Sequence, residues 1–172
     1  RRYQLAEQGF KNILIEERNF EDPVSHFMLA TSQFHQGKMI DCKRTCDSYL
    51  NKYPNSKYDF NIKIMLSDIL ISKEKYSYVL EQLLPLRESL IDSTMLSKID
   101  YRLYNSIVMD INSDNIEQLL FLSENNVSKS ILNLARSYRS LLDGNVNDME
   151  LSLSVIDATL LPVSNILYDI AF

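Results

Sequence analysis

The chain has 172 residues and a net charge of −5; 45% of its residues are hydrophobic and 24% are charged. This length suits a single domain over residues 1–172 with a continuous core, and the composition is globular rather than disordered. The acidic balance, with Lys and Arg scattered along the chain, argues against nucleic acid as a partner. Uninterrupted apolar stretches are only a few residues long, so we expect that this fragment does not span a membrane.

Helical periodicity runs through the chain almost from end to end. Apolar residues recur at the 3.6-residue spacing that places them on one face of a helix. The three glycines and four prolines are too few for the frequent turns of a many-stranded β fold. The sequence therefore predicts an all-α fold of about ten helices, in which short loops force sequential helices to pack antiparallel.

Local stop and start signals divide this pattern into elements. A helix over residues 3–18 comes first, and Asp22 followed by Pro23 marks the start of the next helix. Gly37 is the turn of the hairpin that this second helix opens. Pro85 should kink or split its helix, because proline removes a backbone donor and clashes with the preceding turn. The predicted hairpins span residues 23–53, 57–91, 94–123 and 128–160, and helices at 3–18 and 162–172 cap the array.

The first hairpin follows the spacing of a tetratricopeptide repeat, which is 34 residues long. Leu29 and Ala30 occupy the places of its Leu-Gly/Ala pair, and Gly37 occupies its turn. Cys42 takes the small-residue place of the second helix, and Pro54 takes the place of the closing proline. Small residues at these places let two helix backbones approach closely, and the proline ends the second helix.

The later hairpins echo this pattern with substitutions. In the second hairpin Glu74 replaces the turn glycine, and in the fourth Leu134 and Ala135 precede a turn at Gly144. The segment 53–58, Tyr-Pro-Asn-Ser-Lys-Tyr, resembles the link between repeats in the bacterial envelope branch of tetratricopeptide proteins, the YfgM, YbgF and BamD group. Residues 130–156 are similar to the last repeat of YfgM-like proteins.

This resemblance implies a fold, a setting and a class of partner. The fold would be a right-handed superhelix of stacked antiparallel hairpins. YfgM-like proteins are inner-membrane proteins with one transmembrane helix and an extracytoplasmic repeat domain, associated with the Sec translocon and periplasmic chaperones. By this resemblance we expect a periplasmic domain, tethered by an N-terminal anchor that would precede Arg1 and is missing from this fragment.

Residue patterns for catalysis are missing from the sequence. The two histidines, His26 and His35, have no Cys or carboxylate cluster at ligand spacing around them, whereas a metal site needs three or four convergent ligands. Cys42 and Cys46 lie one helical turn apart, either as small packing residues or as a strained redox pair. Nucleophile-elbow, phosphate-loop and dinucleotide-binding patterns do not occur. We therefore expect no enzyme activity, cofactor, metal or small-molecule substrate.

A protein or peptide is the predicted partner. In a tetratricopeptide array the inward faces of the first helices form a groove, where apolar groups anchor a peptide and polar groups select it. The predicted partner-binding residues are Phe27, Thr31, Phe34, His35, Ile64, Asp68, Arg102 and Asn105. An equal alternative is that the N-terminal helix covers this face.

The sequence thus predicts a non-enzymatic protein–protein interaction scaffold of the bacterial envelope, related to the translocon and its chaperones or to envelope assembly. Two alternatives stay open. One is a structural module that self-associates through residues 163–172 into a homo-oligomer. The other is a peptide-binding adaptor of the same fold in the cytoplasm, without an anchor.

Overall fold

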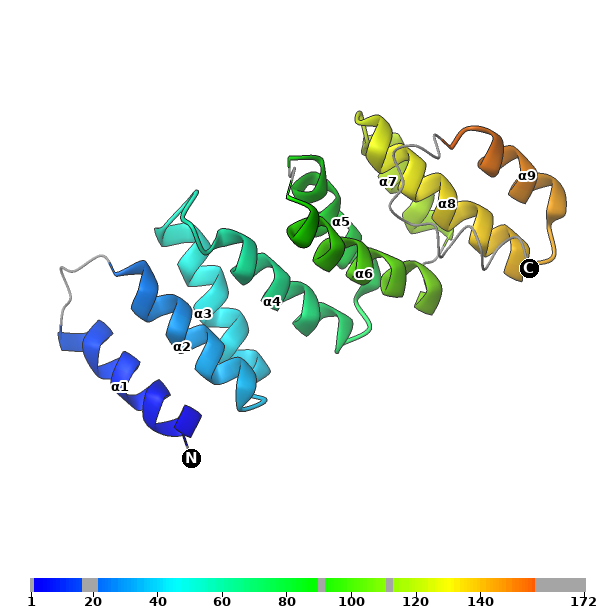
Figure 1. Cartoon of the computed structure of the whole chain (residues 1–172). Helices are drawn as coiled ribbons and strands as arrows, with labels where there is room; N and C mark the ends of the chain where they lie inside the picture. Colours follow the sequence, from blue (N-terminus) through cyan, green and yellow to red (C-terminus); the bar gives the residue numbers. More distant parts are fainter. Residues whose placement is uncertain (1, 17–21, 90–91, 111–112, 157–172) are drawn as a thin grey trace. The chain divides into compact units, whose positions relative to one another are not determined.

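The computed structural model describes residues 2–16, 22–89, 92–110 and 113–156. Every regular element in this part of the chain is an α-helix, which confirms the predicted all-α class (Figure 1). The chain forms two compact units, unit 1 (residues 1–69) and unit 2 (residues 70–172). The described helices are α1 (Arg2–Glu16), α2 (Pro23–His35), α3 (Met39–Lys52), α4 (Asp59–Ile71), α5 (Tyr76–Glu88), α6 (Ser93–Asp110), α7 (Ser113–Leu122), α8 (Asn126–Leu142) and α9 (Val146–Ser154).

Helix starts and stops follow the local signals in the sequence. Asp22 caps α2, because its carboxylate accepts hydrogen bonds from the backbone N–H groups of Val24 at 2.9 Å and Ser25 at 3.1 Å. Pro23 occupies the first helical turn, where its missing N–H costs nothing. At the other end of the first hairpin, α3 stops shortly before Pro54. The two helices of this hairpin therefore extend from Pro23 to His35 and from Met39 to Lys52.

The structure differs from the prediction at Pro85 and at the end of α9. Pro85 lies inside an unbroken α5, because the buried side chains of Leu84 and Arg87 on either side of it hold the helix against its neighbours. The expected split at Pro85 is therefore wrong, whereas the alternative, a kink, stays a prediction. α9 ends at Ser154 rather than at residue 160, and the N–H of Val155 bonds back to the Leu153 carbonyl in a tightened last turn.

Two predicted elements reach beyond what the structure describes. The helix expected over residues 162–172 lies outside the described residues. The hairpin expected over residues 57–91 comprises α4 and α5, and the boundary between the units falls at Ile69. The pairing of α4 with α5 therefore stays a prediction, as does the right-handed superhelix.

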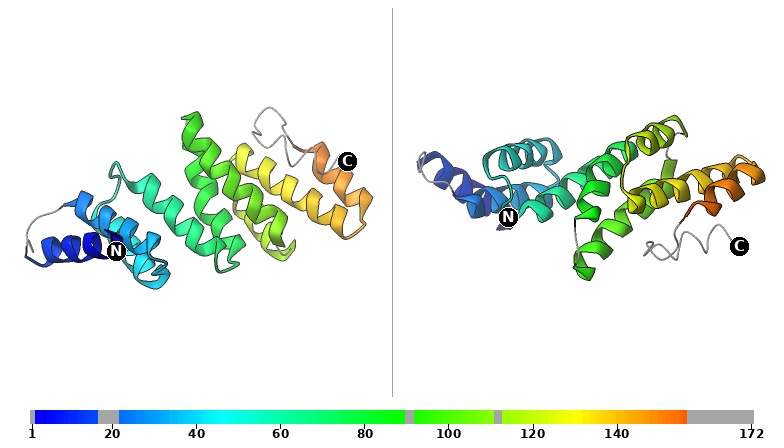
Figure 2. Two further views of the ribbon diagram at one scale, coloured as in Figure 1. Left: turned by 60° about the horizontal axis from the view of Figure 1, so that its bottom comes forward. Right: turned by 90° about the horizontal axis from the view of Figure 1, so that it is seen from above.

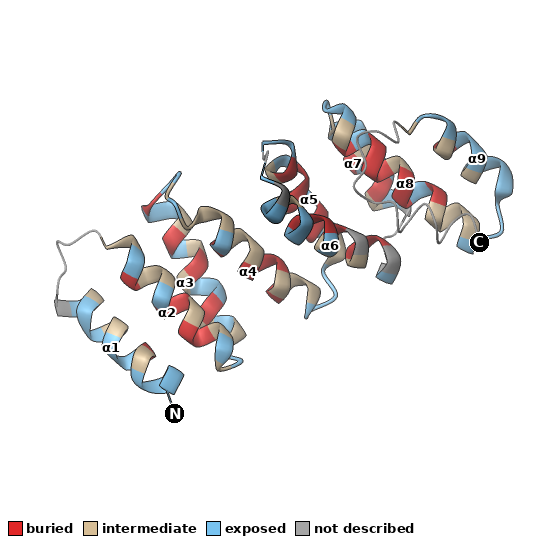
Figure 3. Cartoon of the chain, viewed as in Figure 1, coloured by how far each residue is buried: buried red, intermediate tan, exposed pale blue. Residues whose placement is uncertain are grey.

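Unit 1 is built around α2, which packs between α1 and α3 (Figure 1). Small side chains meet where α2 and α3 cross: the Cys42 thiol donates a hydrogen bond of 3.4 Å to the Ala30 carbonyl. Both residues are fully buried, so the two backbones approach as closely as the repeat spacing predicted. The unit 1 core contains Ala30, Cys42, Cys46, Tyr49, Tyr53, Ile62, Met65, Leu66 and Ile69, from α2, α3, α4 and the turn after α3 (Figure 3).

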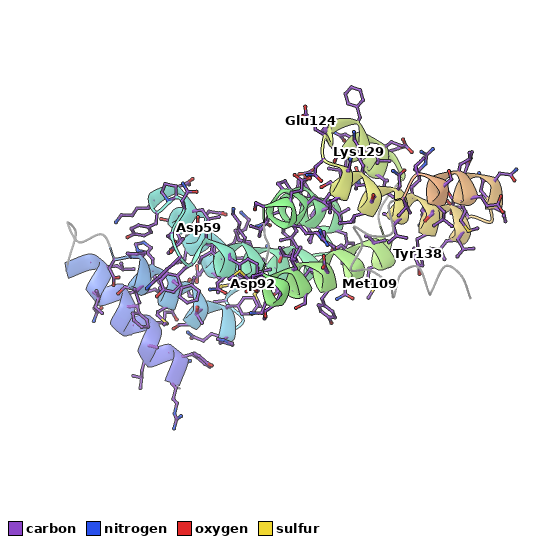
Figure 4. All side chains as sticks on the ribbon, turned by 45° about the horizontal axis from the view of Figure 1, so that its top comes forward. Asp59, Asp92, Met109, Glu124, Lys129 and Tyr138 are labelled. Atoms are coloured by element: carbon purple, nitrogen blue, oxygen red, sulfur yellow. The ribbon has the colours of Figure 1, made fainter. Side chains whose placement is uncertain are left out.

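The link between α3 and α4 is organised by one serine. Ser56 Oγ donates to the Asp59 carboxylate at 2.8 Å and accepts from the Tyr58 backbone N–H at 3.2 Å. The Tyr49 hydroxyl, from the last turns of α3, bonds to the same oxygen. Asp59 lies at the start of α4 (Figure 4), so these bonds tie the end of one helix to the beginning of the next.

Three helix–helix turns share one backbone geometry. Gly37, Glu74 and Gly144 have left-handed backbone conformations, with φ of 71°, 56° and 74°. In each turn the N–H of the following residue bonds to the carbonyl five residues earlier: Lys38 to Gln33 at 3.0 Å, Lys75 to Leu70 at 3.0 Å and Asn145 to Ser140 at 2.8 Å. This is the Schellman arrangement that ends a helix and reverses the chain. The turn positions at Glu74 and Gly144, which repeat the pattern of Gly37 in the sequence, therefore also repeat its backbone geometry.

Unit 2 contains α5 to α9. α8 packs against α9, and the two helices lie side by side in both views of Figure 2; α8 also contacts α5, α6 and α7. α8 contributes four apolar residues to the interior, Ile131, Leu132, Leu134 and Ala135. The inner sides of α5 to α8 are mostly buried, whereas α9 is mostly exposed (Figure 3). The remaining apolar core residues of unit 2 are Val79, Leu80, Leu83, Leu84, Ile99, Leu103, Ile107, Ile116 and Leu119.

A buried ion pair joins α5 to α6 within unit 2. Arg87 Nε lies 2.7 Å from Asp100 Oδ1, and the two side chains are only 9% and 10% exposed. Burial raises the pKa of Asp100 above its ordinary value, although the Arg87 guanidinium opposes that shift. The energy of the pair depends on both partners, because removing one leaves the other charge buried and unpaired.

We predict that Glu74→Gly stabilises the protein by about 1 kcal/mol, because a side chain at a left-handed backbone position costs energy that glycine avoids. Gly37→Ala should destabilise it by about the same amount. A Cβ at Gly37 would have no neighbour within 4 Å, so this second cost is purely conformational. Chemical denaturation followed by circular dichroism measures both changes. Equal stability of all three proteins would contradict the shared turn geometry.

We predict that Arg87→Met destabilises the protein by about 3–5 kcal/mol, because it leaves the buried Asp100 carboxylate without its ion-pair partner. The double variant Arg87→Met, Asp100→Leu should recover part of this loss, since it removes both charges and keeps apolar volume. The exposed pair Lys43–Asp47, with 2.6 Å between its charged atoms, is the matched control. Lys43→Met should cost less than about 1 kcal/mol. Denaturation curves that give Arg87→Met and Lys43→Met similar costs would refute this assignment.

Candidate functional site

The aromatic residues predicted to line the groove of unit 1 take part in packing. Phe27 stacks on Tyr58 with ring centroids 4.5 Å apart and an angle of 8° between the rings. Both rings, together with Phe34, pack against the unit 1 core as half-buried side chains. Thr31 donates its hydroxyl hydrogen bond to the Phe27 carbonyl at 2.9 Å, within α2. These three predicted residues therefore already have partners inside unit 1.

His35, at the end of α2, lies against the N-terminal helix. Its ring stacks on Tyr3 of α1, with centroids 4.7 Å apart and an interplanar angle of 20°. Next to it, Gln36 Nε2 donates a hydrogen bond of 3.1 Å to the Tyr3 carbonyl. Of the two alternatives for this face, contact with α1 is the one that the structure supports at His35.

Glu7 anchors α1 on the α2–α3 hairpin. Its carboxylate, 5% exposed, lies 2.6 Å from Lys38 Nζ in the α2–α3 turn and 2.7 Å from Lys11 Nζ on its own helix. Gln36 Nε2 donates a further hydrogen bond of 2.9 Å. Lys11 and Lys38 together lower the pKa of Glu7 to about 2. Sequence reasoning missed this residue: its spacing to Lys11 indicated a local pair, but nothing indicated Lys38, 31 residues away.

The other predicted residues are divided between the units. Ile64 and Asp68 are half-buried on α4 in unit 1, whereas Arg102 and Asn105 are half-buried on α6 in unit 2. Arg102 Nη1 donates to the Lys98 carbonyl, one helical turn earlier, at 2.8 Å. The structure thus brings Phe27, Thr31, Phe34 and His35 onto α2 but does not join all eight predicted residues into one described site.

Among the described residues, no group of three or more His, Cys, Asp or Glu side chains is placed to hold a metal ion. His26 Nδ1 lies 3.2 Å from the Tyr53 hydroxyl, and burial lowers the pKa of this histidine. Cys42 and Cys46 are buried free thiols, with sulfurs 3.9 Å apart. The sequence did not indicate that the sulfur of Met65, on α4, would lie against both thiols.

A hollow of about 680 Å³ opens in unit 2 between α5 and the α7–α8 turn. Glu124 lies at this turn (Figure 4), and the Glu88 carboxylate accepts a hydrogen bond from the Ser128 hydroxyl across the hollow. Leu122, which lines the hollow from α7, is 64% exposed, and the preceding residue Phe121 is 89% exposed. The lining consists of four apolar residues (Leu84, Pro85, Leu119, Leu122), three acidic residues (Glu81, Glu88, Glu124) and three polar residues (Ser123, Asn125, Ser128).

Only weak signals in the sequence point to this hollow. Residues 119–122 are four apolar residues in a row, which extend around most of the circumference of a helix, and this could have indicated an apolar surface. The convergence of Glu81, Glu88 and Glu124 depends on packing between α5 and the α7–α8 turn. A pattern of neighbouring residues in the sequence does not indicate packing between distant elements.

Comparison of the chain with protein-family models, with curated proteins and with solved structures gives no match. None of the described helices is both long and apolar enough to cross a bilayer.

We predict that acid weakens the attachment of α1 through Glu7. The folded-state pKa of about 2 lies below the ordinary 4.5, so the stabilisation is complete above about pH 4.5 and is lost as the pH falls towards 2. Wild type should be more stable than Glu7→Gln at pH 6.5, and this difference should vanish near pH 2.

Thermal unfolding of both proteins across this pH range, followed by circular dichroism, measures the difference. The matched control is Asp47→Asn, which removes one carboxylate from an exposed ion pair and should differ little from wild type at any pH. A gap between wild type and Glu7→Gln that stays constant with pH would show that Glu7 acts through packing rather than through its charge.

Proposed function

We propose that this chain is a non-enzymatic protein-interaction scaffold built from helical hairpins of the tetratricopeptide type. The main observation in support is that the same turn geometry recurs at Gly37, Glu74 and Gly144. The first interval is 37 residues and the second is 70, which is twice 35, so the spacing of the turns fits repeats of 35–37 residues if one further turn lies between Glu74 and Gly144. Repeat arrays of this kind present extended surfaces for partner proteins.

The distribution of ionisable groups supports a binding role over a catalytic one. Glu7, Asp22 and Asp100 have shifted pKa values, and each has a partner that serves the fold. Glu7 attaches α1, Asp22 caps α2, and Asp100 pairs with Arg87. None of these three carboxylates is among the described lining residues of the hollow in unit 2, where an acid–base site would need them.

The hollow of unit 2 is the partner surface that the geometry favours. Its apolar lining includes Leu84, Leu119 and Leu122, and no Lys or Arg is among the lining residues that the structure describes. Glu81, Glu88 and Glu124 give it a negative rim. Charge complementarity therefore selects a peptide segment that presents apolar side chains to the apolar lining and Lys or Arg to the rim.

The bacterial envelope is the setting that we propose for this scaffold. Support comes from the link at residues 53–58, which resembles the link of envelope tetratricopeptide proteins. Tyr49, Ser56 and Asp59 form its hydrogen-bonded centre. Cell fractionation of the full-length protein tests this setting: recovery in the membrane fraction with an extracytoplasmic repeat domain supports it, and recovery in the cytosol contradicts it.

We predict that the hollow binds a labelled amphipathic peptide of about 18 residues, with Leu on one helical face and Lys on the other. A scrambled peptide of the same composition should bind at least ten-fold more weakly, because it cannot meet the apolar lining and the acidic rim at once. Glu81→Lys combined with Glu124→Lys should weaken binding of the amphipathic peptide at least ten-fold. Fluorescence anisotropy measures these affinities.

The matched control is Glu74→Lys combined with Glu150→Lys, which changes the net charge equally at exposed positions outside the hollow. This variant should bind like wild type. Equal weakening by both double variants, or equal binding of both peptides, would overturn the hollow as the partner site. Preserved circular dichroism spectra show that each variant is folded.

A further inference from the structure

Three sulfur atoms form a compact triangle in the core of unit 1. Cys42 Sγ lies 3.3 Å from Met65 Sδ, and Cys46 Sγ lies 3.9 Å from each of the other two sulfurs. The cysteines are one turn apart on α3, and Met65 faces them from α4. Two helices of the same unit thus direct three soft donor atoms at one point.

We propose that this triangle is a binding site for a single Cu(I) ion. The circle through three points with these separations has a radius of about 2.2 Å, so a central ion would lie at that distance from every sulfur. This is close to the length of roughly 2.3 Å that a metal–thiolate bond takes in zinc sites. Trigonal coordination by three sulfurs therefore needs little rearrangement of the side chains. The site is independent of the proposed interaction function.

The donor set selects the metal. Thiolate and thioether sulfurs are soft ligands and favour Cu(I), which is stable with only three of them. Zinc requires four ligands in a tetrahedron, and no group of three or more His, Cys, Asp or Glu side chains is placed to hold a metal among the described residues, so the two thiols have no such side chain to complete a zinc site. The geometry therefore fits Cu(I) better than a divalent ion.

Binding exchanges protons for the metal without electron transfer. As the two Cu–S bonds to Cys42 and Cys46 form, the two thiol protons leave to solvent, and the Met65 thioether donates a lone pair. The complex then carries one net negative charge. Cys42 lies in the first turn of α3, where the helix N-terminus favours negative charge, whereas loss of its hydrogen bond to Ala30 is a cost.

Met65 is the ligand that lies nearest to solvent. Its side chain is 9% exposed, whereas both thiols are fully buried. A flexible thioether can change rotamer without disturbing the backbone. We therefore expect Cu(I) to enter slowly past the Met65 side chain, so its binding is measured after equilibration.

The test is an anaerobic competition in which the reduced chain is equilibrated with the Cu(I) complex of bicinchoninate, and the loss of the coloured complex is measured. Wild type should withdraw one Cu(I) per chain, and X-ray absorption should then show three sulfur neighbours at about 2.2–2.3 Å. Met65→Leu, which conserves volume, should bind at least ten-fold more weakly and lose one sulfur neighbour. Cys46→Ala should withdraw no Cu(I).

Met28→Leu is the matched control, because Met28 is an exposed methionine of the same unit, on α2. It should bind Cu(I) like wild type. Failure of the folded wild type to withdraw Cu(I) would overturn the proposal and leave the three sulfurs as packing atoms. Binding with two sulfur neighbours that Met65→Leu does not change would overturn the three-sulfur site. Circular dichroism establishes that each variant is folded.

Discussion

A single left-handed residue at the end of a helix is the constraint that shapes the α2–α3, α4–α5 and α8–α9 turns. At Gly37 the reversed backbone sends α3 back along α2, and the crossing then brings Ala30 against Cys42. A larger side chain at that crossing would separate the helices and open the core that they share with α4. Glu74 has the same left-handed conformation although it is not glycine, which costs energy. The turn geometry is therefore present at a position where the sequence lacks the glycine that indicates it.

The parts of the fold that could be predicted are those that local chemistry determines. Asp22 and Pro23 fix the start of α2 through a cap and a preset φ angle, and Gly37 fixes its end. Pro85 misled the prediction, because burial on both sides of it outweighs the lost backbone hydrogen bond. The Glu7–Lys38 contact was not predictable, because it joins residues that only the packing of α1 on α2 brings together.

The two units differ in what they offer to a partner. In unit 1 the predicted groove residues on α2 already contact the protein itself, through Tyr58 and Tyr3. In unit 2 an apolar hollow with an acidic rim is open to solvent beside Phe121. Closed packing in unit 1 and an open surface in unit 2 are the features on which the proposed interaction scaffold is based.

The repeat interpretation depends most directly on the backbone at Glu74, where no glycine makes a left-handed turn easy. Nuclear magnetic resonance of the labelled chain measures this through the intraresidue amide-to-Hα Overhauser effect, which is strong only when φ is positive. We expect a strong effect at Glu74, equal to that at Asn55, the other described non-glycine residue with positive φ. A weak effect with helical chemical shifts from Leu70 to Val79 would mean that α4 and α5 form one continuous helix, and it would contradict the repeated hairpin.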